Sequence, residues 1–266
     1  MFSLTECDYP SGSAHWSPPV LLAHNKYVEL WSPGDFASPG VETVAESGAT
    51  PTLQAEIEIL QTKGLAGEMV MGVPQFNNMV QSQDLGPITL SPSFPFLSTI
   101  SMIAPSPDWF SGFESFSPRG PGGYWFETFE VATYPFDAGT EQGTTYTPEN
   151  DAESPHGPIY QLTRDTVPGS GVFLDETGAT VMPVATWKCN LMYTEEDMNK
   201  DTNMNVNMNK DTNMKMNTEK KDTEKMDTSM NTNMIVNMGG NPSGGLRGED
   251  ANSKMSKASK LSKMIP

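Results

Sequence analysis

Residues 105–116 read PSPDWFSGFESF, and residues 134–143 read YPFDAGTEQG. The first stretch follows the apolar run FLSTISMIA, so Asp108 is expected in a loop just after a strand ends. The second follows another well-formed strand and places Asp137 in a glycine turn. The interval of 29 positions from Asp108 to Asp137 lets the chain leave along one edge of a sandwich and return to the same end. The sequence therefore predicts that Asp108, Asp137 and Glu141 converge.

Three converging carboxylates need a positive partner. Like charges a few ångströms apart raise one another's pKa and destabilise the fold, and neither loop has a Lys or Arg within several residues. Calcium accepts about six to eight oxygen ligands in flexible geometry, which suits two loops better than the strict octahedron of magnesium. We predict a Ca²⁺ site formed by Asp108, Asp137 and Glu141. The structural alternative is that Asp108 caps a turn and Asp137 forms an Asx-turn.

The rest of the first 193 residues reads as short β segments cut by Pro and Gly. Aromatic and β-branched residues are frequent in these segments, and no strand–helix–strand alternation is visible. This pattern predicts an all-β fold, an antiparallel β-sandwich with one or two short helices. Trp109, Phe110, Trp125 and Phe126 are interpreted as core residues. The expected strands lie within residues 20–31, 66–73, 96–105, 124–136, 158–167 and 181–193.

Two short helices interrupt this pattern. Residues 38–48, SPGVETVAESG, begin with a capping Ser and a Pro and end in Gly, with an apolar face at helical spacing. Residues 52–64, TLQAEIEILQTKG, carry Leu53, Ile57 and Leu60 on one helical face, although their alternation also fits a strand. We favour a helix for both segments.

Charge and composition divide the chain in two. Residues 1–193 contain 5 Lys and Arg against 22 Asp and Glu, and residues 194–266 contain 11 of each, so the whole net charge of −17 lies on the first part. An acidic domain repels phosphate backbones, so nucleic acid is a poor partner unless a cation intervenes, and we expect no nucleic-acid binding. Residues 194–266 are rich in Met, Asn and Lys and repeat the hexamer NKDTNM, so we predict a disordered low-complexity tail.

Compartment and cysteine pairing stay open at this point. The opening MFSLTECDYPSGSAHW has neither a positive start nor an apolar h-region, so no secretion signal is visible. No apolar run approaches the roughly 20 residues that span a bilayer. Cys7 and Cys189, the only cysteines, either form a bridge that ties the two ends of the acidic domain together or remain two thiols.

The two opening stretches resemble the signature of the spondin domain family. PSPDWFSGFESF followed by YPFDAGTEQG is similar to that signature, with DWF and DAGT its most specific parts. Residues 15–48, HWSPPVLLAHNKYVELWSPGDFASPGVETVAESG, are similar to the opening of the domain, where a WSP element precedes a short helix. The resemblance runs from about His15 to Tyr193 and leaves out the tail.

The resemblance implies an antiparallel β-sandwich that binds one calcium ion. The ligands would be the Asp of the DWF motif and two acidic residues four apart around the DAGT turn, which fall on Asp108, Asp137 and Glu141. Glu141 departs from the Asp of the animal members, which puts the affinity for the ion in question. The resemblance also implies a non-enzymatic, secreted domain that recognises an extracellular or cell-surface macromolecule in adhesion or in the matrix.

Two alternative functions come from other classes. A secreted hydrolase using paired carboxylates would rely on Asp108 and Asp137, with one of them protonated near neutral pH. An intracellular calcium-dependent membrane-binding module is permitted by the missing signal, so membrane binding stays uncertain. Zinc chemistry is not indicated, because His15, His24 and His156 lack ligand spacing and His24 is interpreted as structural.

Overall fold

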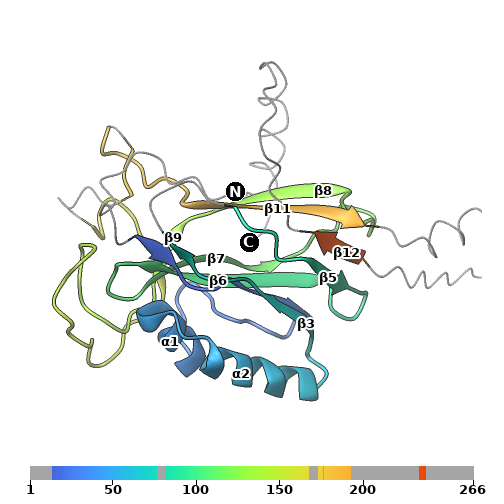
Figure 1. The fold of residues 1–266 in the computed structure, drawn as a ribbon, viewed down its shortest axis with the longest axis horizontal. Helices are drawn as coiled ribbons and strands as arrows, with labels where there is room; N and C mark the ends of the chain where they lie inside the picture. The colour runs from blue at the N-terminus through green and yellow to red at the C-terminus, as the bar shows by residue number, and fades with distance from the viewer. Residues whose placement is uncertain (1–13, 77–81, 168–172, 176, 193–233, 238–266) are drawn as a thin grey trace, which may run out of the picture.

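The computed structural model describes residues 14–76, 82–167, 173–175, 177–192 and 234–237. These residues form two antiparallel sheets that pack face to face, with two helices against the outer face of the larger sheet (Figure 1). Every strand pairing that the structure describes is antiparallel. The predicted all-β class, an antiparallel sandwich with two short helices, is confirmed.

The larger sheet has eight strands. Along its main path the order is β10-β9-β7-β6-β1-β4, and β2 joins β6 and β3. Its strands are β1 (His15–Trp16), β2 (Val20–His24), β3 (Ala66–Met71), β4 (Gln75–Phe76), β6 (Phe96–Ala104), β7 (Trp109–Phe116), β9 (Pro135–Asp137) and β10 (Tyr160–Gln161).

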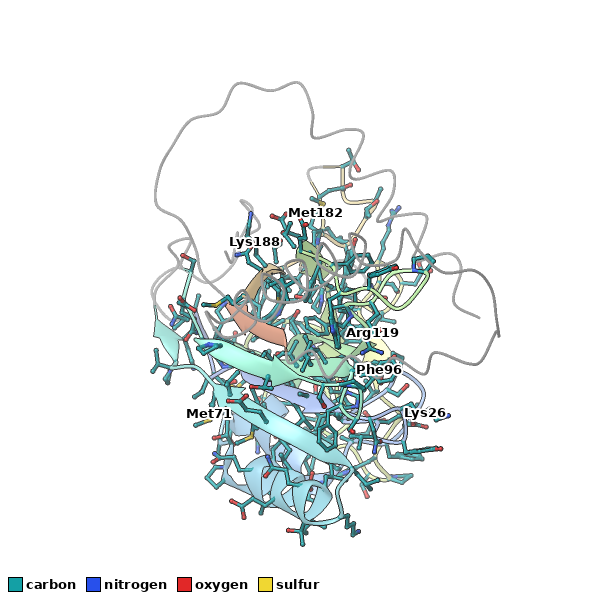
Figure 2. The ribbon with its side chains drawn as sticks, turned by 90° about the vertical axis from the view of Figure 1, so that its right-hand side faces the viewer. Lys26, Met71, Phe96, Arg119, Met182 and Lys188 are labelled. Atoms are coloured by element: carbon teal, nitrogen blue, oxygen red, sulfur yellow. The ribbon has the colours of Figure 1, made fainter. Side chains whose placement is uncertain are left out.

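The smaller sheet has four strands in the order β5-β12-β11-β8. They are β5 (Pro87–Leu90), β8 (Thr128–Thr133), β11 (Ala185–Met192) and β12 (Met234–Asn237). Its outer side faces away from the helices: Lys188 and Met182 lie there, whereas Met71 lies on the helix side of the molecule (Figure 2). Lys188 Nζ contacts Glu130 Oε1 at 2.7 Å, the one ion pair among the described residues.

Strand β2 shows how one sheet serves two cores. Its residues alternate between the two faces of the sheet. Val20 and Leu22 pack with the helices, and Leu21 and Ala23 pack with the smaller sheet. A strand covered on both faces reads as a continuous apolar run, which explains why VLLA shows no polar alternation.

Helices α1 (Pro39–Ser47) and α2 (Pro51–Thr62) confirm both helix predictions. Ser38 Oγ accepts the Val41 N–H at the start of α1, and Gly48 ends α1 in the left-handed region at φ 70°. Leu53 and Ile57 of α2 are fully buried in the core shared with the larger sheet. The helical face, and not the alternating one, is therefore the buried face of α2.

Glu56 of α2 caps the neighbouring helix. Its Oε2 accepts the Ser38 hydroxyl proton at 2.7 Å, and its Oε1 accepts the Gly40 N–H at 2.8 Å. A carboxylate at a helix N-terminus is also favoured by the helix dipole. Glu56→Ala removes both bonds, so we expect the free energy of unfolding to fall by about 2–3 kcal/mol in urea denaturation. Glu58→Ala, on the exposed face of α2, is the control; equal losses in the two variants would contradict the capping role.

The observed strands are shorter than the sequence suggests. Of residues 20–31 only β2 is a strand, and residues 158–167 contribute only the two residues of β10. Trp109 and Phe110 are fully buried as predicted, whereas Trp125 and Phe126 are partly buried at the edge of the core between the sheets. The buried His24 has both ring nitrogens in hydrogen bonds, to Asn25 O and Ser98 Oγ, in keeping with its structural interpretation.

Five of the observed strands were not predicted: β1, β4, β5, β7 and β12. Strand β7 lies in the middle of the larger sheet, and Gly112 within it passes so close to the Thr99 carbonyl that a side chain there would clash. Strand β12 comes from the segment for which we predict disorder, and for these four residues that prediction is corrected because β12 pairs with β5 and β11. The remaining residues of the predicted tail lie outside the described part of the chain.

Candidate metal centre

Asp108 and Asp137 meet because their strands are neighbours. Strand β7 begins at Trp109 and strand β9 ends at Asp137, and the register pairs these two residues. The Ala138 N–H then donates to the Asp108 carbonyl oxygen at 3.2 Å. The predicted convergence of the two aspartates is therefore present, although it comes from direct strand pairing and not from loops that meet at the end of a sandwich.

The Asp108 side chain is fully buried, and only one of its two carboxylate oxygens accepts hydrogen bonds from the described residues. Its Oδ2 accepts the Thr140 N–H at 2.7 Å, the Glu141 N–H at 3.1 Å and the Thr140 hydroxyl at 3.2 Å. Its Oδ1 has no hydrogen-bond partner among the described residues. A buried carboxylate oxygen without a partner is costly, so Oδ1 is the position at which this centre lacks a ligand.

Asp137 is buried and receives donors on both oxygens. Its Oδ1 accepts the Gly139 N–H at 2.8 Å, and its Oδ2 accepts the indole N–H of Trp109 at 3.1 Å. Tyr160, on the paired strand β10, lies opposite Asp137 in the register. The bond to Gly139 is the Asx-turn that the sequence suggests as an alternative. The turn and a role in ion binding are compatible, because each oxygen retains a second lone pair.

Gly139 makes the turn possible. Its φ of 71° favours glycine, and a Cβ there would approach the Gly157 carbonyl oxygen to 2.5 Å. The Gly157 N–H donates to the Gly139 carbonyl at 2.7 Å, and the Glu153 N–H donates to the Thr140 carbonyl at 2.8 Å. The turn is thus held against residues 151–157, which fixes the backbone of Glu141 beside Asp108.

Glu141 is half-buried, and a fourth carboxylate approaches from α1. The Glu46 side chain lies close enough that its charge raises the pKa of both Asp108 and Glu141. No sequence motif points to Glu46, which lies on the polar face of α1 and far along the chain from both motifs. Its proximity results from the packing of α1 on β6 and β7.

Burial and mutual repulsion raise the pKa of each of the three predicted ligands. For Asp108, burial raises the pKa, the hydrogen bonds from Thr140 and Glu141 oppose this, and the charge of Glu46 adds to it. For Asp137, burial and then the charge of Asp108 raise the pKa to about 7. For Glu141, burial, Glu46 and Asp108 act in the same direction. Near neutral pH these groups resist ionisation together unless a cation joins them.

Among the described residues the one ion pair of a carboxylate, between Lys188 and Glu130, is on the smaller sheet and away from this centre. The described side chains also include no group of three or more His, Cys, Asp or Glu placed so that it could hold a metal ion as it stands. The side chains of Asp108 and Asp137 lie close together, whereas Glu141 contacts Asp108 through its backbone N–H. The donor chemistry fits a hard cation, because all the groups are carboxylate oxygens and Asp108 Oδ1 is unpaired.

Comparison with known proteins identifies the family. The sequence profile described as Spondin_N matches residues 5–183. The chain therefore belongs to the spondin N-terminal domain family.

Individual relatives agree with this assignment. Human Spondin-1 is 31% identical over 188 residues, which is 67% of this chain and 22% of the relative. Rat Spondin-2 is 31% identical over 150 residues, 56% of this chain and 45% of the relative. The chain spans less than half the length of these relatives, so it is similar to one part of each of them.

The other sequence-based expectations have mixed outcomes. Cys189 is buried in the core between the sheets, and Cys7 lies outside the described residues, so both alternatives for the two cysteines stay open. The described part of the chain has no helix of the length and apolar character that crossing a membrane requires.

Proposed function

We propose that this chain is a non-enzymatic, calcium-binding spondin-type domain that recognises an extracellular or cell-surface macromolecule. The observation that carries the calcium site is the pair of buried carboxylates, Asp108 and Asp137, on adjacent strands. Family membership supports the extracellular recognition role.

The ion would bind at the unpaired oxygen of Asp108. Asp108 Oδ1, Asp137 and Glu141 would be its carboxylate ligands. Backbone carbonyls and water complete the coordination that calcium prefers. A bound divalent cation neutralises the repulsion and keeps all the carboxylates ionised.

The hydrolase alternative has one point in its favour, since a pKa of about 7 would let Asp137 act as an acid. However, Asp108 is fully buried and Asp137 nearly so, and each already accepts two or more hydrogen bonds. A glycoside or ester cannot reach buried carboxyl groups of this kind, whereas a small ion can. The geometry therefore supports binding over hydrolysis.

Isothermal titration calorimetry with calcium tests the site. We expect saturable binding of one ion to the full chain and at least about tenfold weaker binding to Glu141→Gln, which removes one carboxylate ligand and leaves the turn intact. Glu58→Gln, on the exposed face of α2, serves as the matched control because it removes the same charge far from the centre.

Equal binding to all three proteins would refute the proposed ligand set, and absence of saturable heat in the unsubstituted chain would refute the site. Magnesium in place of calcium should give weaker binding, because a site assembled from a strand end and a turn does not impose an octahedron. Co-sedimentation with anionic vesicles, with and without calcium, separates the membrane-binding alternative from a domain that binds macromolecules.

A further inference from the structure

Strand β12 occupies a central place in the smaller sheet although it is far from its neighbours in sequence. It pairs antiparallel with β5 on one side, where Val236 lies opposite Ile88, and with β11 on the other, where Val236 lies opposite Leu191. Figure 1 shows β12 beside the end of β11 and next to β5. In sequence, 41 residues (193–233) separate β11 from β12.

Strand β5 depends on β12 for its pairing. Among the described strands β5 is hydrogen-bonded to β12 alone. The Thr89 N–H on its other side donates to Glu68 Oε2 of β3 at 2.7 Å, so by alternation the backbone groups of Ile88 and Leu90 face β12. Both side chains are fully buried in the core between the sheets. Without β12 these backbone groups would lie unpaired against an apolar core, which is unfavourable.

The connection to β12 is much longer than the pairing requires. Antiparallel neighbours can be joined by about two residues, yet here 42 residues lie between Met192 and its partner Ile235. Loop-closure entropy makes docking through such a connection roughly 30-fold less favourable than through a loop of about four residues. The strand is therefore covalently attached near its site, and its place in the sheet rests on its pairings with β5 and β11.

We propose that the gap between β5 and β11 is an acceptor site for one extended apolar segment, and that its occupant is this chain's own Met234–Asn237, which docks and leaves without unfolding the rest of the domain. The chemistry of recognition is backbone pairing on both sides, as in β-strand addition. The ligand class is thus a short, extended, uncharged peptide such as MIVN. The proposal does not depend on calcium binding.

Hydrogen exchange on the full chain carrying Val236→Pro tests this. Because β12 has a neighbour on each side, every backbone N–H in it faces a strand, and Pro removes one. We expect exchange at Ile88 and Leu90 to accelerate about tenfold or more, while the amides of β6 and β7 keep their protection. The control Thr223→Pro, in the connecting segment, should leave all rates unchanged.

Rescue with a peptide completes the test. A labelled peptide of residues 230–240 should bind Val236→Pro and restore protection at Ile88, and it should bind the unsubstituted chain at least about tenfold more weakly because the site there is filled. If Val236→Pro leaves β5 exchange unchanged, or if the peptide binds both chains equally, the proposal fails. Val236→Gly, which weakens the strand without removing an N–H, guards against global unfolding: loss of β6 protection in parallel with β5 would also overturn the proposal.

Discussion

Asp108→Asn is expected to raise the melting temperature of the chain in EDTA and to lower it, relative to the unsubstituted chain, in millimolar calcium. The amide is nearly isosteric with the carboxylate. Its oxygen can accept the same hydrogen bonds from Thr140 and Glu141, and its NH₂ group takes the place of the unpaired Oδ1. Only the charge and the ligand oxygen are lost.

The sign of the effect reverses for a physical reason. Without an ion, removing one of two buried like charges relieves repulsion on Asp137, a gain of about 1–3 kcal/mol. With calcium at about 100 times its dissociation constant, the unsubstituted chain gains about 2.7 kcal/mol that the variant does not. For a domain of this size each kcal/mol shifts the melting temperature by about 2–4 °C.

Thermal unfolding followed by circular dichroism measures both arms. Asp165→Asn, which removes an exposed charge elsewhere, is the control. It should change the melting temperature by no more than about 1 °C, both in EDTA and in calcium. The same change of melting temperature in EDTA and in calcium would show that Asp108 is a structural residue without an ion. If Asp108→Asn is stabilised in EDTA and its melting temperature still rises with calcium, Asp108 is not a ligand of the ion.

The second large effect concerns pH. Asp137 has a pKa of about 7 in the folded chain and about 4 when unfolded, so the folded state binds the proton more tightly. Its contribution to stability is fully present below about pH 4 and is lost as pH rises to about 7, a fall of about 3–4 kcal/mol. The raised pKa values of Asp108 and Glu141 act in the same direction. In EDTA, we expect stability to decline over this range.

Calcium should abolish this decline, because the ion keeps the carboxylates ionised at no cost in repulsion. Burial lowers the pKa of His24, so His24 contributes stability that is lost as pH falls below its ordinary value, the opposite sign. The difference between urea unfolding curves with calcium and with EDTA isolates the acidic centre, since His24 lies elsewhere on β2. Parallel curves at all pH values would contradict the proposed ion.

The sequence allowed the fold class, both helices and the meeting of Asp108 with Asp137 to be predicted, because each depends on a local pattern or a motif. Strand β7 was not predicted, since Ser111, Gly112 and Ser115 interrupt its apolar residues and its stability comes from neighbours on both sides. Glu46 reaches the centre only through the packing of α1 on the sheet. Strand β12 gains its partners from positions more than 40 residues away, beyond the reach of any local signal.

The hydrogen bond between the Trp109 indole and Asp137 gives the centre an optical reporter. Trp109 is fully buried, with Tyr146 and Phe173 edge-on to its ring at 5.8 Å and 5.7 Å between centroids. The emission of an indole depends on the charge next to its N–H, so the fluorescence of Trp109 follows the ionisation state of Asp137. The protein thus carries, without any label, a fluorophore that reads the charge of this carboxylate.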